Sequence, residues 1–136
     1  MDRLIVDTGF LVALGRAADP RHDSALRLFA TIKVPLVTVS AVIVESCHFL
    51  ETRAKRALLD WILDDGPAVV DVPVAGYADL SAIIGKYPQR EVDFADAALI
   101  WLAETTGHRK IITVEETDFS LFRLKGGKRF ELVEWA

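Results

Sequence analysis

Acidic side chains occur at five positions beside or within apolar segments, where a charged group is costly to bury. These positions are Asp7, Glu45, Asp96, Glu115 and Asp118. The first follows the apolar run 4–6, and the last two follow the run 110–113. A divalent cation removes the cost of burying such charges, and Mg²⁺ and Mn²⁺ prefer oxygen ligands. The pattern predicts a metal site of the kind that activates water against phosphodiesters.

Each of these acids also has a purely structural explanation. Asp7 could cap a helix, Glu45 could face solvent or form an ion pair, and Asp118 could be a turn or cap residue. Asp93 precedes Asp96 by three residues, and we favour a capping role for it. The order of the acids along alternating strand and helix patterns is harder to explain in this way. The group as a whole therefore favours a shared site.

The segments that carry the acids alternate between strand and helix patterns. Strands are predicted over 4–6, 36–39, 69–72, 110–113 and 130–133. Helices are predicted over 9–17, 21–32, 40–52, 53–64, 75–87 and 94–105, with Ser40 as an N-cap and Gly107 closing the last helix. The pattern shows no hairpin signal, so it indicates an α/β fold with a mainly parallel sheet. Sites in such folds form beyond the carboxyl ends of the strands.

The length of 136 residues fits a single domain over 1–136, and the 51% hydrophobic content supports a real core. The one cysteine, Cys47, excludes an internal disulfide framework and favours a reducing compartment. Asp7 interrupts the N-terminal apolar run, and no run approaches the length of a membrane helix. We therefore expect a cytoplasmic protein without a membrane segment. The net charge of −4 argues against unspecific nucleic-acid binding over the whole surface.

Four short segments carry the acids in a fixed order: Val6-Asp7-Thr8, then Val42-Ile43-Val44-Glu45, then 93–97, then 112–119. In this order and spacing the chain resembles the PIN-domain ribonucleases, and most closely the VapC-type toxins of toxin–antitoxin pairs. The resemblance runs over almost the whole chain. It implies a three-layer α/β/α PIN-like fold around a central parallel sheet of about five strands. It also implies an endoribonuclease that depends on Mg²⁺ or Mn²⁺.

The resemblance assigns roles to individual residues. It implies that Asp7, Glu45 and Asp96 bind the metal, and that Thr8 and Thr113 support these ligands from behind. Asp93 joins them as a further supporting residue. The family has Asp at the position of Glu115, so the longer side chain departs from the pattern at a site where geometry is strict. Glu115, with Asp118 nearby, is the candidate holder of a second ion.

Binding of RNA also needs positive charge near the acids. Between Phe119 and Phe130 every charged residue is basic: Arg123, Lys125, Lys128 and Arg129. This stretch is a candidate RNA-guiding loop, and the alternative is an ordinary solvated face. The apolar segments 24–32 and 41–62 exceed what one small core needs, which favours a homodimer. The resemblance further implies a protein antitoxin as a partner.

Three rival functions remain. A catalytically weak or inactive PIN-fold module that binds metal or RNA would account for Glu115. A phosphatase with an aspartyl nucleophile would need a second Asp two residues after the first, where this chain has Gly9. A phosphorylated receiver domain would need paired acids after the first strand and a Lys after the last, and neither is evident. We expect the metal-dependent ribonuclease.

Overall fold

The fold is that of a computed structural model, which describes residues 2–135. Its sheet has five parallel strands in the order β3-β2-β1-β4-β5. The strands are β1 (Leu4–Val6), β2 (Leu36–Val39), β3 (Ala68–Val70), β4 (Lys110–Ile112) and β5 (Glu131–Leu132). The chain moves outward in one direction from β1 to β3 and in the other from β4 to β5. The point at which the order reverses, between β1 and β4, is where α/β sheets open a crevice for ligands.

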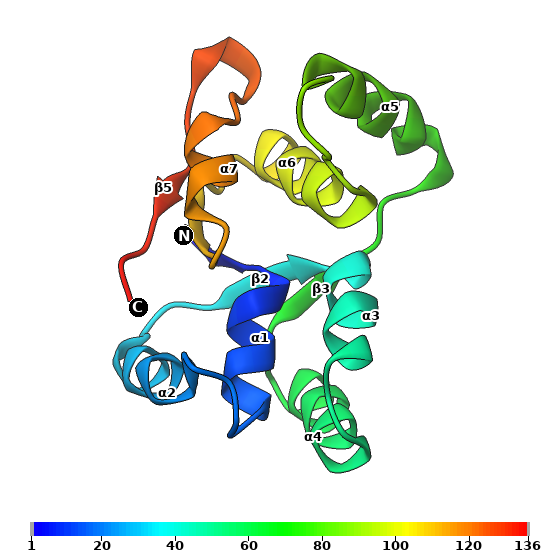
Figure 1. The fold of residues 1–136 in the computed structure, drawn as a ribbon. Coiled ribbons are helices and arrows are strands. Elements are labelled where there is room, and N and C mark those ends of the chain that lie inside the picture. Colours follow the sequence, from blue (N-terminus) through cyan, green and yellow to red (C-terminus); the bar gives the residue numbers. More distant parts are fainter. Residues whose placement is uncertain (1, 136) are drawn as a thin grey trace.

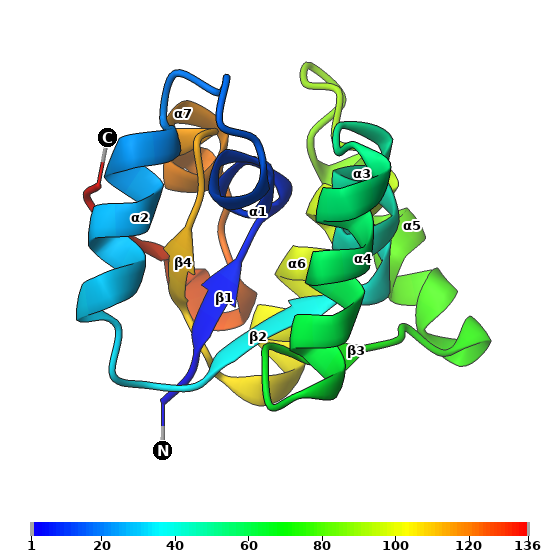
Figure 2. The same cartoon turned by 90° about the horizontal axis from the view of Figure 1, so that it is seen from below.

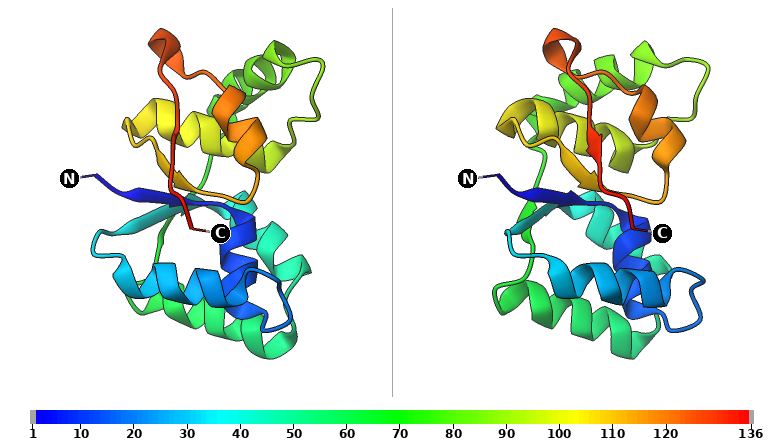
Figure 3. Two further views of the ribbon diagram at one scale, coloured as in Figure 1. Left: turned by 60° about the vertical axis from the view of Figure 1, so that its left-hand side comes forward. Right: turned by 90° about the vertical axis from the view of Figure 1, so that its left-hand side faces the viewer.

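Helices cover both faces of this sheet (Figures 1 and 3). The helices are α1 (Thr8–Gly15), α2 (His22–Thr31), α3 (Ser40–His48), α4 (Thr52–Leu63), α5 (Tyr77–Lys86), α6 (Phe94–Thr106) and α7 (Glu116–Leu121). One layer holds α1, α2 and α4, with α1 between the other two (Figure 2). The other layer holds α5, α6 and α7, and α3 contacts both α1 and α6. The predicted three-layer α/β/α fold is confirmed.

Helix α6 is the buried centre of its layer. Its sequence is apolar around most of the helix, so it cannot present a polar face to water and is enclosed instead. Every residue from Ala95 to Ile100 is buried, as are Leu102 and Ala103. Gly107 ends the helix in the left-handed conformation, with φ of 81°, as its position in the sequence predicted. The burial extends to Asp96, which therefore lies within the packed interior.

Several predicted boundaries are wrong, for reasons that lie in the tertiary structure. Ser40 is the first helical residue and not the N-cap, because β2 passes directly into α3. The segment predicted as one helix over 40–52 ends at His48, and buried Leu50 follows in the turn before α4. Strand β3 stops at Val70 because its neighbour β2 ends at Val39, the partner of Val70. Residues 71 and 72 thus have no strand beside them.

The remaining elements agree with the predicted ones to within a few residues. Helix α1 begins at Thr8 and α2 at His22, and a 3₁₀ turn at Val74–Gly76 precedes α5. Strand β5 is reduced to two residues beside β4. None of the helices within residues 2–135 combines the length and the apolar character needed to cross a membrane.

The first turn of α1 packs tightly against the segment that follows β4. A Cβ atom added to Gly9 would lie 2.4 Å from Cγ2 of Val114. We expect Gly9→Ala to lower the free energy of unfolding by about 1–3 kcal/mol, because α1 or Val114 must move. Gly85 on α5 has no atom within 4 Å of the same position, so Gly85→Ala should raise it by up to about 1 kcal/mol. Urea denaturation of both variants is the measurement. If Gly9→Ala were as stable as Gly85→Ala, the close packing at Gly9 would be contradicted.

Candidate active site

Asp7 follows β1, where the strand order reverses between β1 and β4, and its carboxylate is held from two sides. It caps α1 by accepting a hydrogen bond from the Thr8 backbone N–H at 2.7 Å. Its second oxygen accepts one from the Thr113 hydroxyl at 2.8 Å. Its own backbone N–H donates to the Ile112 carbonyl, which joins the ends of the two strands. Asp7 is only 4% exposed, so the residue that caps α1 also places a carboxyl group in the interior.

Two threonines extend this arrangement to the neighbouring acids. The Thr8 hydroxyl donates to Oε1 of Glu45 on α3, at 2.5 Å. The Thr113 hydroxyl, which donates to Asp7, accepts from the backbone N–H of Glu115 at 2.9 Å. One hydrogen-bonded chain therefore runs from Glu115 through Asp7 to the Thr8–Glu45 pair. The structure brings together residues that follow β1 and β4 with one that lies on α3.

The amino end of α6 adds two further acids. Asp93 caps the helix, and its carboxylate accepts the backbone N–H of Asp96 at 2.8 Å, as we favoured from the sequence. Asp96 lies one turn into the helix and is 8% exposed. Asp93 in turn is exposed to solvent. The cap thus fixes the helix end that carries the buried carboxyl of Asp96.

Burial and mutual repulsion make these acids hard to ionise. Burial, opposed in part by its hydrogen bonds, raises the pKa of Asp7 from 3.8 to about 6. Burial and then the charges of Asp93, Glu115 and Asp7 raise the pKa of Asp96 to about 8. Partial burial of its carboxyl, followed by the charge of Asp7 and other acids, raises the pKa of Glu115 to about 7. The charged groups that raise these pKa values are all carboxylates, so the site carries an excess of negative charge that a bound cation would balance.

The donor atoms fit a hard divalent cation. Asp7, Glu45, Asp96 and Glu115 offer carboxylate oxygens, the ligand type that Mg²⁺ and Mn²⁺ prefer. Across residues 2–135, no three His, Cys, Asp or Glu side chains stand close enough together to enclose an ion in their present positions. The four acids therefore share one electrostatic site, while their side chains are not closed around a single point.

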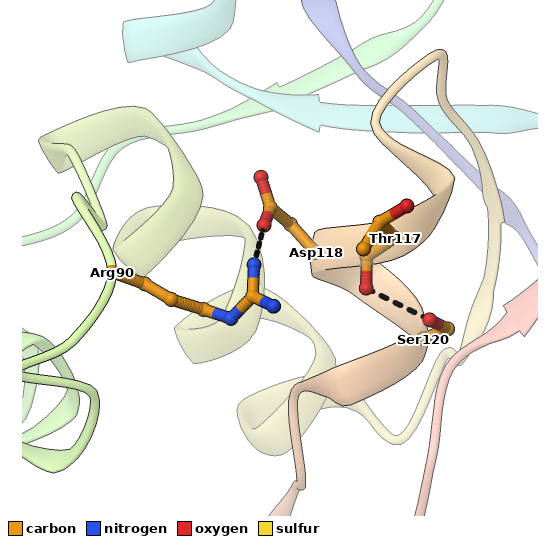
Figure 4. A network of polar contacts seen from close by, with 4 residues as sticks. All are labelled: Arg90, Thr117, Asp118 and Ser120. Atoms are coloured by element: carbon orange, nitrogen blue, oxygen red, sulfur yellow. Dashed lines mark hydrogen bonds and ion pairs between the residues drawn. The ribbon is translucent and has the colours of Figure 1, made fainter.

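Asp118, the fifth acid, has a different partner. On α7 it forms an ion pair with Arg90, which reaches it from the loop before α6 (Figure 4). The Ser120 hydroxyl donates to the Thr117 carbonyl within the same short helix. Asp118 is still near enough to Glu115 for its charge to raise the pKa of that residue. Asp118 therefore lies at the border of the acidic site, and its carboxylate is paired with the guanidinium of Arg90.

The predicted basic stretch lies away from the acids. Lys128 and Arg129 precede β5, whose first residue pairs with Lys110 at the amino end of β4. The acids follow the carboxyl ends of β1 and β4, and residues before and after a parallel strand lie at opposite edges of the sheet. Lys125 belongs to the same exposed turn, which extends beyond α7 (Figure 3). The structure does not bring these side chains to the site.

Arg123, the remaining predicted RNA-binding residue, supports the fold. Its guanidinium donates to the carbonyls of Ser120, Leu121 and Phe122 at the end of α7, at 3.0 to 3.1 Å. A cation at the carboxyl end of a helix satisfies carbonyls that have no partner within the helix. Its backbone N–H also donates to the hydroxyl of Tyr87. These contacts connect α7 to the end of α5.

Sequence reasoning missed three residues that border the site. The buried Thr38 of β2 donates its hydroxyl to the Val6 carbonyl, directly before Asp7. Trp135 donates its indole N–H to the Thr113 carbonyl. Arg90 is the third, through its pair with Asp118. A hydroxyl inside the apolar run 36–39 was a visible signal for Thr38, whereas no local pattern singles out the other two.

A separate apolar groove lies on the layer opposite α6. It has a volume of about 830 Å³ and is formed by α1, α2, α4 and the turn between α3 and α4. Leu26, Phe29 and Phe49 line it and are each at least 40% exposed. Arg16, Glu51 and Arg53 are the charged residues along it. The excess of apolar residues predicted for segments 24–32 and 41–62 contributes to this surface.

The order β3-β2-β1-β4-β5 and the acids at its reversal point define a PIN-like α/β/α protein with a candidate cation site. No family model matches the chain. Ribonuclease VapC26 of Mycobacterium tuberculosis is 28% identical over 134 residues, or 96% of this chain and 99% of the relative. The 23S rRNA-specific endonuclease VapC20 of the same organism is 28% identical over 123 residues, or 90% of this chain and 82% of the relative.

Solved structures agree with these relatives. The crystal structure of VapC20, described as a Sarcin-Ricin loop cleaving toxin, aligns with a TM-score of 0.73 at 28% identity, over 79% of this chain and 86% of that one. VapBC2 of Rickettsia felis, solved with a promoter DNA fragment, aligns with a TM-score of 0.65 at 13% identity. The alignment covers 96% of this chain and 98% of that one. That second likeness concerns the fold alone. The resemblance to the VapC-type PIN-domain proteins is confirmed.

Removal of divalent cations should make stability depend on pH. In this state the folded protein keeps protons on Asp7, Asp96 and Glu115 that the unfolded chain, with ordinary values of 3.8 and 4.5, releases. The free energy of unfolding therefore falls as the pH rises from about 5 to about 8. The side chain introduced by Asp96→Asn cannot ionise. The free energy of unfolding of this variant, relative to that of the wild type, should therefore rise by more than about 1 kcal/mol over this range.

Urea denaturation in EDTA at both pH values measures this gain. The exposed Asp60 of α4 lies outside the acidic group, so Asp60→Asn is the matched control and should show no gain. Added Mg²⁺ should stabilise the wild type at the higher pH. A constant stability difference between Asp96→Asn and the wild type would contradict the raised pKa of Asp96.

Proposed function

We propose that this protein is a metal-dependent endoribonuclease that hydrolyses RNA phosphodiester bonds, and that it is the toxin of a toxin–antitoxin pair. The observation that carries the proposal is the pair of buried carboxyls, Asp7 and Asp96, with raised pKa values and carboxylates as their charged neighbours. A protein keeps such groups together at a cost in stability, which a functional cation explains. The names of VapC26 and VapC20 support RNA as the substrate.

The chain's own residues have distinct roles in this proposal. Asp7, Glu45 and Asp96 hold Mg²⁺ or Mn²⁺, while Thr8 and Thr113 fix the orientation of Glu45 and Asp7 through the hydrogen bonds described above. The bound cation would supply charge neutralisation at the phosphate and lower the pKa of a water. Asp93 supports the site by capping the helix of Asp96.

Among the four acids Asp7, Glu45, Asp96 and Glu115, Glu115 is the exposed one. An exposed carboxylate can accept a proton from a water molecule, as general base catalysis requires. The backbone of Glu115 is held by Thr113, so the longer side chain starts from a fixed position. We propose that Glu115 contributes to catalysis in this way, or through a second ion, in place of the shorter Asp of the family.

Metal-dependent cleavage of RNA tests this function directly. Asp7→Asn and Asp96→Asn should each lower kcat by at least about 100-fold on RNAs that the wild type cleaves with Mg²⁺ or Mn²⁺, because each loses a charge that holds the cation. Asp60→Asn should retain activity. Gel analysis of a varied RNA pool is the measurement. Wild-type protein that cleaves no RNA with either ion would instead support the inactive, metal- or RNA-binding alternative.

We also propose that the apolar groove receives an antitoxin. Its shape, an apolar trough between helices, suits an amphipathic helix whose anchors repeat every three or four residues. Arg16 and Arg53 along the groove favour acidic residues on such a helix. The groove is on the helical layer opposite α6, so docking there leaves the acids accessible.

A homodimer would use another surface. Tyr77 of α5 and Phe94 of α6 pack edge to face, with ring centroids 5.7 Å apart, and remain 47% and 46% exposed. Val74, in the turn before α5, is 78% exposed. Aromatic side chains that remain exposed as a group are typical of interfaces. We propose that two copies meet here, next to the amino end of α6 and therefore beside the acidic site.

Two variants separate these surfaces and serve as controls for each other. Where a small open reading frame adjoins the gene, Leu26→Glu should abolish capture of the protein it encodes, and leave the dimer intact. Tyr77→Glu should yield monomers and retain the capture. Co-purification and sedimentation equilibrium measure the two outcomes. Either variant affecting both properties, or neither, would contradict the assignment of separate surfaces.

A further inference from the structure

A phosphodiester that enters this site meets an excess of negative charge. Asp7, Glu45, Asp96 and Glu115 together with Asp93 and Asp118 bring six carboxylates to one edge of the sheet. One divalent cation balances only part of this charge. An anionic RNA backbone therefore requires a further positive group at the same edge.

The basic residues favoured from the sequence do not meet that requirement. Lys125, Lys128 and Arg129 lie toward the amino ends of β4 and β5, at the opposite edge of the sheet. Arg123 uses its guanidinium on the last carbonyls of α7. The cation at the acidic edge has to come from another part of the chain.

Arg90 has the required position. It lies three residues before Asp93, in the loop that leads into α6, and pairs with Asp118 in the first turn of α7. Its guanidinium thus bridges the two elements that flank the acids, one carrying Asp96 and the other following Glu115. Figure 4 shows the side chain extended from the loop across the space to α7.

The pair with Asp118 is readily broken. The side chains of Arg90 and Asp118 are 35% and 39% exposed, and ion pairs with this exposure to water contribute little to stability. A phosphate offers the guanidinium a better partner, because two of its oxygens match the planar N–H groups. Exchange of a carboxylate for a phosphate at Arg90 would also move positive charge toward the substrate.

We propose that Arg90 binds the RNA phosphate at the acidic site, and that Asp118 is its resting partner rather than a metal ligand. This proposal rests on the proposed ribonuclease function. In the free protein the carboxylate of Asp118 holds the guanidinium at the border of the site. When RNA binds, the phosphate replaces that carboxylate. No covalent bond changes in this exchange.

Steady-state cleavage of an RNA oligonucleotide that the wild type cleaves tests the role of Arg90. Arg90→Ala should raise KM about tenfold with a much smaller change in kcat, because one charge-assisted contact to the substrate is lost. The dependence of kcat/KM on salt should weaken by the equivalent of about one phosphate contact. Arg90→Lys, which keeps the charge without the planar fork, should restore part of the loss.

Arg109 provides the matched control. It forms the second ion pair found in residues 2–135, with Glu131, and its side chain is 37% exposed. That pair lies at the amino edge of the sheet, so Arg109→Ala should leave KM and the salt dependence close to those of the wild type. Circular dichroism and urea denaturation of both alanine variants show whether each is folded.

Asp118→Asn tests the second part of the proposal. Release of the guanidinium should lower KM about threefold, since the phosphate no longer competes with a carboxylate. The same substitution in the Arg90→Ala background should leave KM unchanged, because the competing pair is already absent. An increase in the Mg²⁺ concentration needed for activity would show that Asp118 holds metal, and would overturn its role as a resting partner.

Three results would overturn the proposal for Arg90. Arg90→Ala could match Arg109→Ala in KM and salt dependence, or it could lower kcat alone and leave KM unchanged. Both outcomes would leave the ribonuclease function standing while excluding Arg90 as the phosphate-binding residue. Wild-type protein without any cleavage of RNA would overturn the proposed function, and this proposal with it.

Discussion

Repulsion among carboxylates gathered where β1 and β4 end is the constraint on which the other features of this protein depend. Three of these acids have pKa values raised into the neutral range, and burial is the first cause for each. The fold keeps them together by fixing their backbones. Asp7 and Asp93 cap helices, and Thr113 joins the carboxyl of Asp7 to the backbone of Glu115. The surrounding scaffold therefore maintains a concentration of acids whose repulsion is relieved by protons or by an added cation.

The same constraint explains how the molecule divides its surfaces. Charge is concentrated at the carboxyl edge of the sheet, where α1, α6 and α7 begin. Apolar surface lies in the groove between α1, α2 and α4 and at the exposed rings of Tyr77 and Phe94. The groove is on the helical layer opposite α6, whereas the two rings lie beside the amino end of α6 and its acids. The fold resembles that of VapC20, a related protein that is described as a toxin that cleaves the sarcin-ricin loop.

Local patterns were sufficient for most elements. Composition alone predicts the strands in the β-branched runs 4–6 and 36–39 and the helix with the apolar face over 94–105. Capping preferences likewise predict the two ends of α6, at Asp93 and Gly107. The wrong boundaries occur where an element's end is set by a neighbouring segment in the tertiary structure. Strand β3 ends with its partner β2, and the helix from Ser40 stops where Leu50 turns into the core. The residue types at these two boundaries do not predict where the elements end.

By itself, the sequence determined that the chain carries a group of acids suited to a divalent cation, because burial cost depends on residue type and on immediate neighbours. Tertiary structure alone decided which positive charge accompanies them. The basic stretch near the end of the chain follows α7 in sequence, yet it lies at the opposite edge, because residues before and after a parallel strand are separated by the length of that strand. Arg90 has no distinctive local pattern, and it meets Asp118 because the fold brings the loop before α6 close to the first turn of α7.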